Sequence, residues 1–98
     1  MIQHIVMMTL AENADAEELT SVMEGFAALE LPGFVGFEHG PNLDFEKLSQ
    51  PHPYGFICSF EDSEALQIYA DDPRHKALGA RLIALCTDGV FVADLKVG

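Results

Sequence analysis

The sequence contains no tryptophan, and only two of its 98 residues are cysteines. These two, Cys58 and Cys86, are too few for a disulfide scaffold, and their separation does not match a metal-binding motif. Each lies in an apolar segment. We therefore expect both to be reduced thiols buried in the core.

Basic residues are also scarce. The chain has 5 lysines and arginines against 16 aspartates and glutamates, which gives a formal net charge of −11. Such a charge repels phosphate backbones and anionic lipids, so we expect neither a nucleic acid nor a membrane as a partner. No apolar segment is long enough to cross a bilayer, and the N-terminus has no basic segment with a cleavage site. We expect a cytoplasmic protein.

Spacings typical of metal ligands are missing too. No two of the four histidines are separated as in H-x-H or by four residues along a helix. We therefore expect no bound metal, although carboxylates are abundant.

The length and patterning predict one domain, residues 1–98, of the α+β class. Alternating or continuous apolar residues predict four strands, and start signals predict three helices. One helix begins after Asp15, one begins at Glu61-Asp62-Ser63 and one begins after Asp72. The strands lie at 1–10, 34–40, 54–60 and 90–97. If the last two helices form one broken element, the order is βαββαβ. This is the ferredoxin-like arrangement, an antiparallel sheet with helices on one face.

The faces of these strands indicate how the sheet is covered. Both faces of strand 1–10 are largely apolar, so we expect a second copy of the chain to pack sheet to sheet against the face without helices. In strand 34–40 the face with Val35, Phe37 and His39 is the more apolar, so we expect it in the core. Residues 43–53 are the longest irregular segment and favour a mobile loop, and Asp88-Gly89 favours a turn before the last strand.

Several segments, in this order, resemble those of the stress-responsive A/B barrel (Dabb) family. The first strand has the form M-I-x-H-I-V, and G-x-N ends the second strand. A-L-x-x-Y follows on a helix, then a segment that matches H-P-x-H, and V-x-D lies in the last strand. Here these segments are Met1–Val6, Gly40–Asn42, Ala65–Tyr69, Asp72–His75 and Val92–Asp94. The resemblance covers essentially the whole chain, with one departure: Asp72 replaces the first histidine of H-P-x-H.

The resemblance implies a homodimeric α+β barrel with a pocket for a small apolar or aromatic ligand between the helices and the sheet. Characterised members of the family include plant polyketide cyclases, which use neither a metal nor an organic cofactor. The resemblance implies that His75 is the base, that Tyr69 assists it and that His4 lines the site. It also implies a set of apolar pocket walls: Met8, Met23, Phe26, Phe56, Leu78, Leu82 and Val92.

The residue types allow the same roles but also simpler ones. The imidazole of His75 titrates near neutrality and can move a proton, with Asp71 and Asp72 as candidates to orient it or hold it protonated. It can equally cap a helix or pair with a surface carboxylate. His4 can be a hydrogen-bonded core histidine, and Tyr69 can lie at the core edge with its hydroxyl in water.

Two functions remain open at this point, and with them whether the protein is an enzyme. The first is a cofactor-free cyclase or lyase that uses His75 as its base. The second is a non-catalytic dimeric binding or stress-response protein, whose pocket is small or filled by its own side chains. A dimeric barrel of the monooxygenase type, with the same fold but no H-P-x-H segment, is a weaker third option.

Overall fold

The computed structural model describes residues 1–49 and 51–98. It has the order βαββαβ, with the second crossover broken into two helices. The elements are β1 (Ile2–Leu10), α1 (Ala16–Ala27), β2 (Phe34–Pro41), β3 (Tyr54–Phe60), α2 (Ser63–Asp71), α3 (Pro73–Ala84) and β4 (Cys86–Lys96). The strands form one sheet in the order β2-β3-β1-β4, and each pair of neighbours is antiparallel. The predicted ferredoxin-like α+β fold is confirmed.

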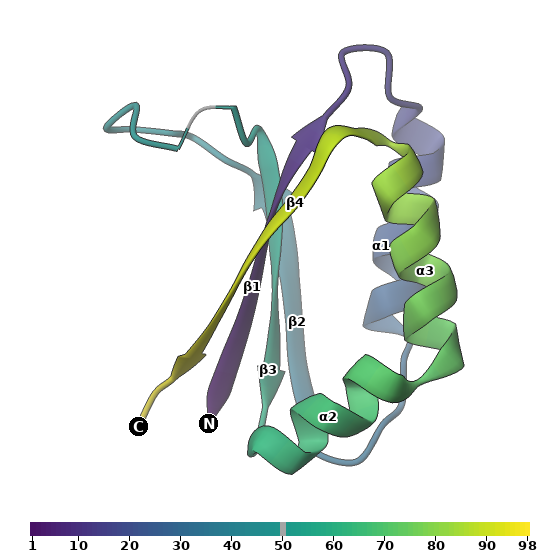
Figure 1. Ribbon diagram of the computed structural model, residues 1–98, viewed down its shortest axis with the longest axis vertical. Coiled ribbons are helices and arrows are strands. Elements are labelled where there is room, and N and C mark those ends of the chain that lie inside the picture. Colours follow the sequence, from purple (N-terminus) through teal and green to yellow (C-terminus); the bar gives the residue numbers. More distant parts are fainter. Residues whose placement is uncertain (50) are drawn as a thin grey trace.

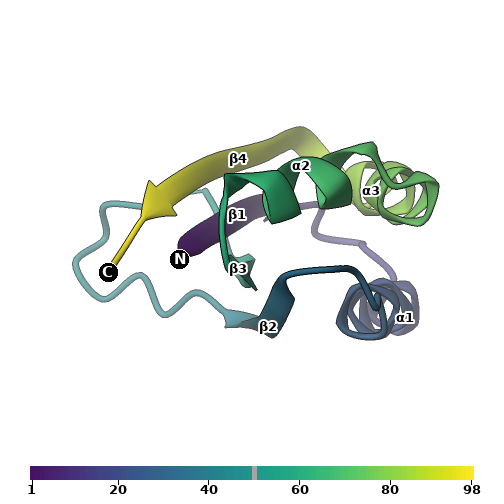
Figure 2. The same cartoon turned by 90° about the horizontal axis from the view of Figure 1, so that it is seen from below.

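The helices lie on one face of the sheet and leave the other face uncovered (Figures 1 and 2). The core between the layers is formed mainly by aromatic and aliphatic side chains, with Phe26 of α1 stacked on Phe56 of β3. None of the helices within residues 1–49 and 51–98 is long and apolar enough to cross a membrane.

Aspartates begin all three helices, and the caps at Asp15 and Asp72 are as predicted. Asp15, Asp62 and Asp72 precede α1, α2 and α3, and each side chain accepts a hydrogen bond from a backbone N–H of the first turn. Asp72 also ends α2, because its extended backbone (ψ 128°) interrupts the helix, and Pro73 starts the next one. This break brings the last turn of α2 and the first turn of α3 together at one corner.

The predicted inner face of β2 is wrong at two of its three positions, because Val35 and His39 are both exposed. Phe34 pairs with Phe60, whereas Gly36 pairs with Ser59, so one extra residue bulges out between them. The bulge exposes Val35 and turns Phe34 toward the core, where its ring stacks on Phe60 at 5.1 Å. Phe37 packs in the core as predicted, and its ring stacks on that of Phe26 at 6.0 Å.

The last strand begins earlier than predicted. β4 starts at Cys86, and the segment Asp88-Gly89 is a bulge inside the strand rather than a turn before it. Gly89 takes a positive φ of 79°, which suits a residue without a side chain. The hydroxyl of Thr9 donates to the Gly89 carbonyl oxygen at 2.9 Å and accepts from the Asp88 N–H at 3.2 Å, so polar groups of the bulge are paired.

The two cysteines are free thiols in different surroundings. Cys58 is fully buried, as predicted, whereas Cys86 is partly exposed, which corrects the prediction. The reason is that Cys86 lies at the start of the edge strand β4. The predicted mobile loop at 43–53 includes Gln50, which lies outside the described residues.

Candidate functional site

A cavity of about 370 Å³ lies between the sheet and the helices. Its polar wall is formed by His4 of β1, Tyr69 of α2 and His75 of α3, the three residues singled out from the sequence. Its remaining wall is largely apolar. Four of the predicted wall residues line it, namely Phe26, Phe56, Leu82 and Val92.

The other three predicted wall residues, Met8, Met23 and Leu78, do not line this cavity. They are buried in the core, with exposed fractions of 0%, 1% and 9%. Their side chains are enclosed by the packing of α1 and α3 on the sheet, so they hold the layers together.

His75 lies in the first turn of α3, half-buried against the ring of Tyr69, with 4.0 Å between the ring centroids. Its Nδ1 is 3.4 Å from the carbonyl oxygen of Ala70, which favours the tautomer with the proton on Nδ1. Burial lowers the pKa of the imidazole, and the Ala70 carbonyl opposes this only in part. His75 is therefore a neutral imidazole at neutral pH. No residue of the described chain hydrogen-bonds to its Nε2, which is free for a ligand.

Tyr69 is almost fully buried at 1% exposure, so its hydroxyl does not lie in water. The thiol of Cys58 donates to this hydroxyl oxygen at 3.7 Å. Burial, and then the neighbouring thiol, raise the pKa of the phenol far above its usual range. The phenol stays protonated, and its O–H remains available to donate to an oxygen.

His4 is fixed by a residue that the sequence analysis did not include in the site. His4 on β1 pairs with Asp94 on β4, and the His4 Nδ1 lies 2.5 Å from the Asp94 Oδ1. In the neutral ring, Nδ1–H donates to the carboxylate, which leaves Nε2 unprotonated. The ring edge also contacts Tyr69, with 5.6 Å between centroids, so the three polar residues form one cluster.

One signal in the sequence could have identified Asp94. It alternates with apolar residues in β4, on the same side as Val90 and Val92. A carboxylate on the core side of a strand needs a polar partner, and His4 is the polar residue on the matching side of β1.

Asp71 and Asp72 do not orient the His75 ring. The carboxylate of Asp72 accepts from the backbone N–H groups of Arg74 and His75 and pairs with the Arg74 guanidinium. Asp71 accepts from the side-chain amide of Gln67 at 3.1 Å. Asp72, which replaces a histidine of the family motif, thus serves as a helix cap.

The remaining histidines are outside the cluster. His39 is exposed and lies 2.6 Å from the hydroxyl of Tyr54, and the Nδ1 of His52 lies 3.2 Å from the carbonyl oxygen of Ser49. Within the described residues, no group of three or more histidine, cysteine, aspartate or glutamate side chains is arranged to hold a metal ion.

Chemically, the cavity combines a neutral imidazole, a protonated phenol and a second imidazole held by a carboxylate. A neutral imidazole with a free nitrogen can remove a proton, and a buried phenol can donate to the oxygen that gains charge. Lys76, next to His75 on α3, is the lysine on the cavity wall and adds positive charge there.

A family model matches nearly the whole chain. The model described as stress responsive A/B barrel domain matches residues 2–97. No curated protein matches the sequence closely enough to count as a relative.

Solved structures are similar over nearly the whole chain. A dimeric ferredoxin-like protein of unknown function from Jannaschia sp. CCS1 is 40% identical, with a TM-score of 0.90 and coverage of 98% of both chains. A protein from Arabidopsis thaliana is 23% identical, with a TM-score of 0.87 over 100% of this chain and 96% of its own. A hydroxynitrile lyase from Passiflora edulis is 11% identical, with a TM-score of 0.81 over 99% of this chain and 93% of its own. The last two similarities concern the fold alone.

Proposed function

This chain belongs to the stress responsive A/B barrel domain family, and we propose that it is a homodimer that binds a small apolar or aromatic ligand in the cavity of each subunit. In this proposal His75 removes a proton from the ligand, without a metal or an organic cofactor. The reaction is a cyclisation, or a carbon–carbon bond cleavage of the lyase type. The protein works in the cytoplasm, in keeping with its two free thiols.

The state of His75 carries the proposal. Its pKa is lowered by burial, it is aligned by the Ala70 carbonyl and by the Tyr69 ring, and its Nε2 is free on a cavity wall. A general base works best when it is unprotonated at the working pH and within reach of the proton that it removes.

The proposed step begins with a C–H group next to a carbonyl. The Nε2 of His75 takes the proton, and the electron pair of the C–H bond forms an enolate, whose oxygen accepts a hydrogen bond from Tyr69. The unprotonated Nε2 of His4 can only accept a hydrogen bond, for example from a hydroxyl group of the ligand. In a cyclisation, the enolate carbon then bonds to a second carbonyl of the same ligand. That carbonyl oxygen receives the proton from His75, so the base is regenerated.

Two observations support the homodimer. The relative that is 40% identical is described as dimeric. On the uncovered face of the sheet, Phe91 and Leu95 of β4 are 56% and 50% exposed, beside Ile5 and Met7 of β1. A second copy packed sheet to sheet would remove this apolar surface from water.

The alternative function is non-catalytic binding, and one contact favours it. The hydroxyl of Tyr69 is turned toward the Cys58 thiol in a buried position. If the phenol stays there when a ligand binds, the oxygen of the ligand receives no hydrogen bond from Tyr69. In that case the cavity binds the ligand but does not catalyse a reaction.

Hydrogen exchange on a carbon acid separates the two functions. An aromatic 1,3-diketone in D₂O serves as the probe, and its loss of α-protons is followed by NMR. Wild type and His39→Ala should accelerate the exchange, whereas His75→Ala should not, with unchanged melting temperatures. Binding of the diketone with no acceleration by wild type would leave only the binding function. Sedimentation equilibrium at micromolar concentration checks the homodimer, and a monomer would refute it.

A further inference from the structure

The connection between β2 and β3 forms an arm, defined here as residues 42–49 and 51–53. Its interior is polar and well paired. The side-chain amide of Asn42 donates to the Ser49 hydroxyl at 2.8 Å and to the His52 carbonyl at 2.7 Å. The carboxylate of Asp44 accepts from the backbone N–H of Ser49 at 2.9 Å and from its hydroxyl at 2.7 Å. These bonds give the arm a defined shape.

Large apolar side chains project from this arm into water. Leu43, Phe45 and Leu48 are 83%, 93% and 84% exposed. No other large apolar side chain in the described residues is as exposed as these three. The polar groups of the arm are paired inside it, whereas its large apolar side chains are exposed to water. Such an exposed apolar surface is typical of a site that packs against another molecule.

The arm projects on the side of the sheet that the helices leave uncovered (Figures 1 and 2). It also contacts that face, since the rings of His52 and Phe91 have centroids 6.3 Å apart. The arm and the uncovered face therefore form one continuous surface. On this face, Gln3, Ile5 and Met7 of β1 each belong to a row of paired residues that runs across the four strands. Glu38 is the only charged residue in these three rows. The chain as a whole carries a net charge of −11.

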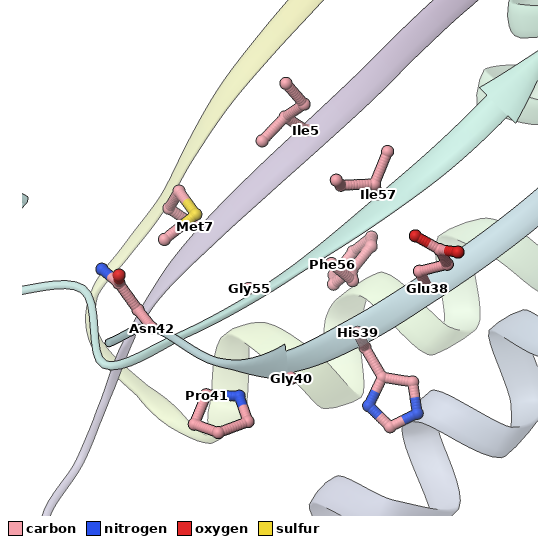
Figure 3. A pocket seen from close by; sticks show the side chains of 10 residues that line it. All are labelled: Ile5, Met7, Glu38, His39, Gly40, Pro41, Asn42, Gly55, Phe56 and Ile57. Atoms are coloured by element: carbon pink, nitrogen blue, oxygen red, sulfur yellow. The ribbon is translucent and has the colours of Figure 1, made fainter. Parts of the chain in front are cut away.

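The same face also contains a hollow of about 340 Å³. Figure 3 shows Ile5, Met7 and Ile57 beside a stretch where Gly40 and Gly55 present no side chain. A side chain placed on Gly40 would meet no atom within 4 Å, so this part of the hollow is open. One face thus has both projections and a depression.

We infer that the arm is a clamp that packs on a second copy of this chain, with Phe45 and Leu48 buried against the partner. The inference rests on the proposed homodimer. An interface about a twofold axis uses the same patch on both copies, so that patch has to be self-complementary. A face with apolar projections and an apolar hollow meets this requirement. A surface for anionic lipid would need positive charge, whereas the arm carries Asp44, Glu46 and a single lysine, Lys47.

The first test compares two variants by sedimentation equilibrium. Phe45→Ser/Leu48→Ser should raise the dimer dissociation constant at least tenfold, with an unchanged far-UV circular dichroism spectrum. Ile68→Ser, at an exposed position on α2, should leave the constant unchanged. A wild-type monomer would refute the homodimer and the clamp together. A wild-type dimer whose constant is the same in the double variant would refute the clamp alone.

The second test uses the absence of tryptophan from the sequence. Phe45→Trp introduces a single fluorophore at the tip of the arm. Its emission should shift to shorter wavelengths as the concentration rises from nanomolar to micromolar, in step with dimer formation. Emission that stays that of solvated tryptophan in the dimer would overturn the clamp. So would a shift that requires phosphatidylserine vesicles, which would assign the arm to a membrane surface.

Discussion

His4 and Asp94 are 90 residues apart in the chain and face each other across neighbouring strands, with Nδ1 of the imidazole 2.5 Å from the carboxylate. The pair holds one imidazole of the cavity in a fixed orientation and leaves its Nε2 for a ligand. In the proposed function Asp94 is a positioning residue, because it would act on the ligand through His4.

Replacing Asp94 with asparagine should test this role. The amide keeps the shape but can donate to Nδ1, so the neutral His4 ring would carry its proton on Nε2 instead. We expect diketone exchange to fall about tenfold or more, since a well-placed proton-transfer group contributes roughly 10²–10⁴-fold. The imidazole ¹⁵N shifts of His4 should report the change of tautomer. Asp71→Asn, on the outside of α2, is the matched control, and equal loss in both variants would contradict the role.

The sequence predicted the parts of the fold that depend on local signals. Helix starts followed from Asp15, Asp62 and Asp72, because an N-cap acts within its own first turn. The strands of the sheet followed from apolar patterning. The grouping of His4, Tyr69 and His75 came from the family resemblance, because their meeting point depends on the packing of α2 and α3 on the sheet.

The features that the sequence did not predict depend on pairing between distant strands. The bulges at Val35 and Gly89 arise where β2 and β4 lose register with their partners, which no local pattern records. The same holds for the partner of His4, since Asp94 meets it only through the β1–β4 register. The polar interior of the arm depends on Asn42, whose contacts reach ten residues along the chain.

Replacing each of the two glycines that line the hollow with alanine should change the free energy of unfolding by different amounts. A Cβ on Gly55 would lie 2.7 Å from the Met7 sulfur and 2.9 Å from the Val6 carbonyl oxygen, and the latter is backbone that cannot turn away. We expect Gly55→Ala to lower the free energy of unfolding by about 1–3 kcal/mol. Gly40→Ala should change it by no more than about 0.5 kcal/mol, because nothing lies within 4 Å. Urea denaturation at equal protein concentration measures both, and equal effects would contradict the packing described here.

The two thiols should react in a fixed order. Burial raises the pKa of Cys58 to about 12, and it raises that of the partly exposed Cys86 as well. In the native protein at pH 8 we expect a disulfide reagent to label Cys86 slowly and Cys58 only after unfolding. Cys86→Ser should abolish the native phase and leave the Cys58 phase in denaturant. Native labelling of Cys58 before Cys86 would show that the core around Tyr69 is open.

The raised pKa of the Cys58 thiol also makes the folding stability of the protein depend on pH. The unfolded chain ionises this thiol above roughly pH 8.5, whereas the folded protein holds it protonated to a much higher pH. Stability should therefore fall as the pH rises above that point. Cys58→Ala should lose this part of the alkaline dependence, which a series of urea titrations between pH 7 and 10 can measure.

The lowered pKa of His75 predicts a pH dependence of the opposite kind. Burial disfavours the imidazolium, so folded His75 stays neutral at a pH where an ordinary histidine, with a pKa near 6.5, is half protonated. Base-dependent exchange of the diketone should therefore persist below pH 6.5.

Below that pH the unfolded chain binds a proton that the folded protein resists, so His75 lowers the folding stability progressively as the pH falls toward the folded pKa of the imidazole. Above pH 6.5 this penalty is absent. His75→Ala should remove the penalty, so the difference in unfolding free energy between variant and wild type should shift in favour of the variant between pH 7 and 5. The Cε1–H resonance of His75 should titrate below 6.5 in the native protein. A midpoint above 6.5 would mean that the ring is exposed or paired with a carboxylate, and His75 would then be a poor candidate for the base.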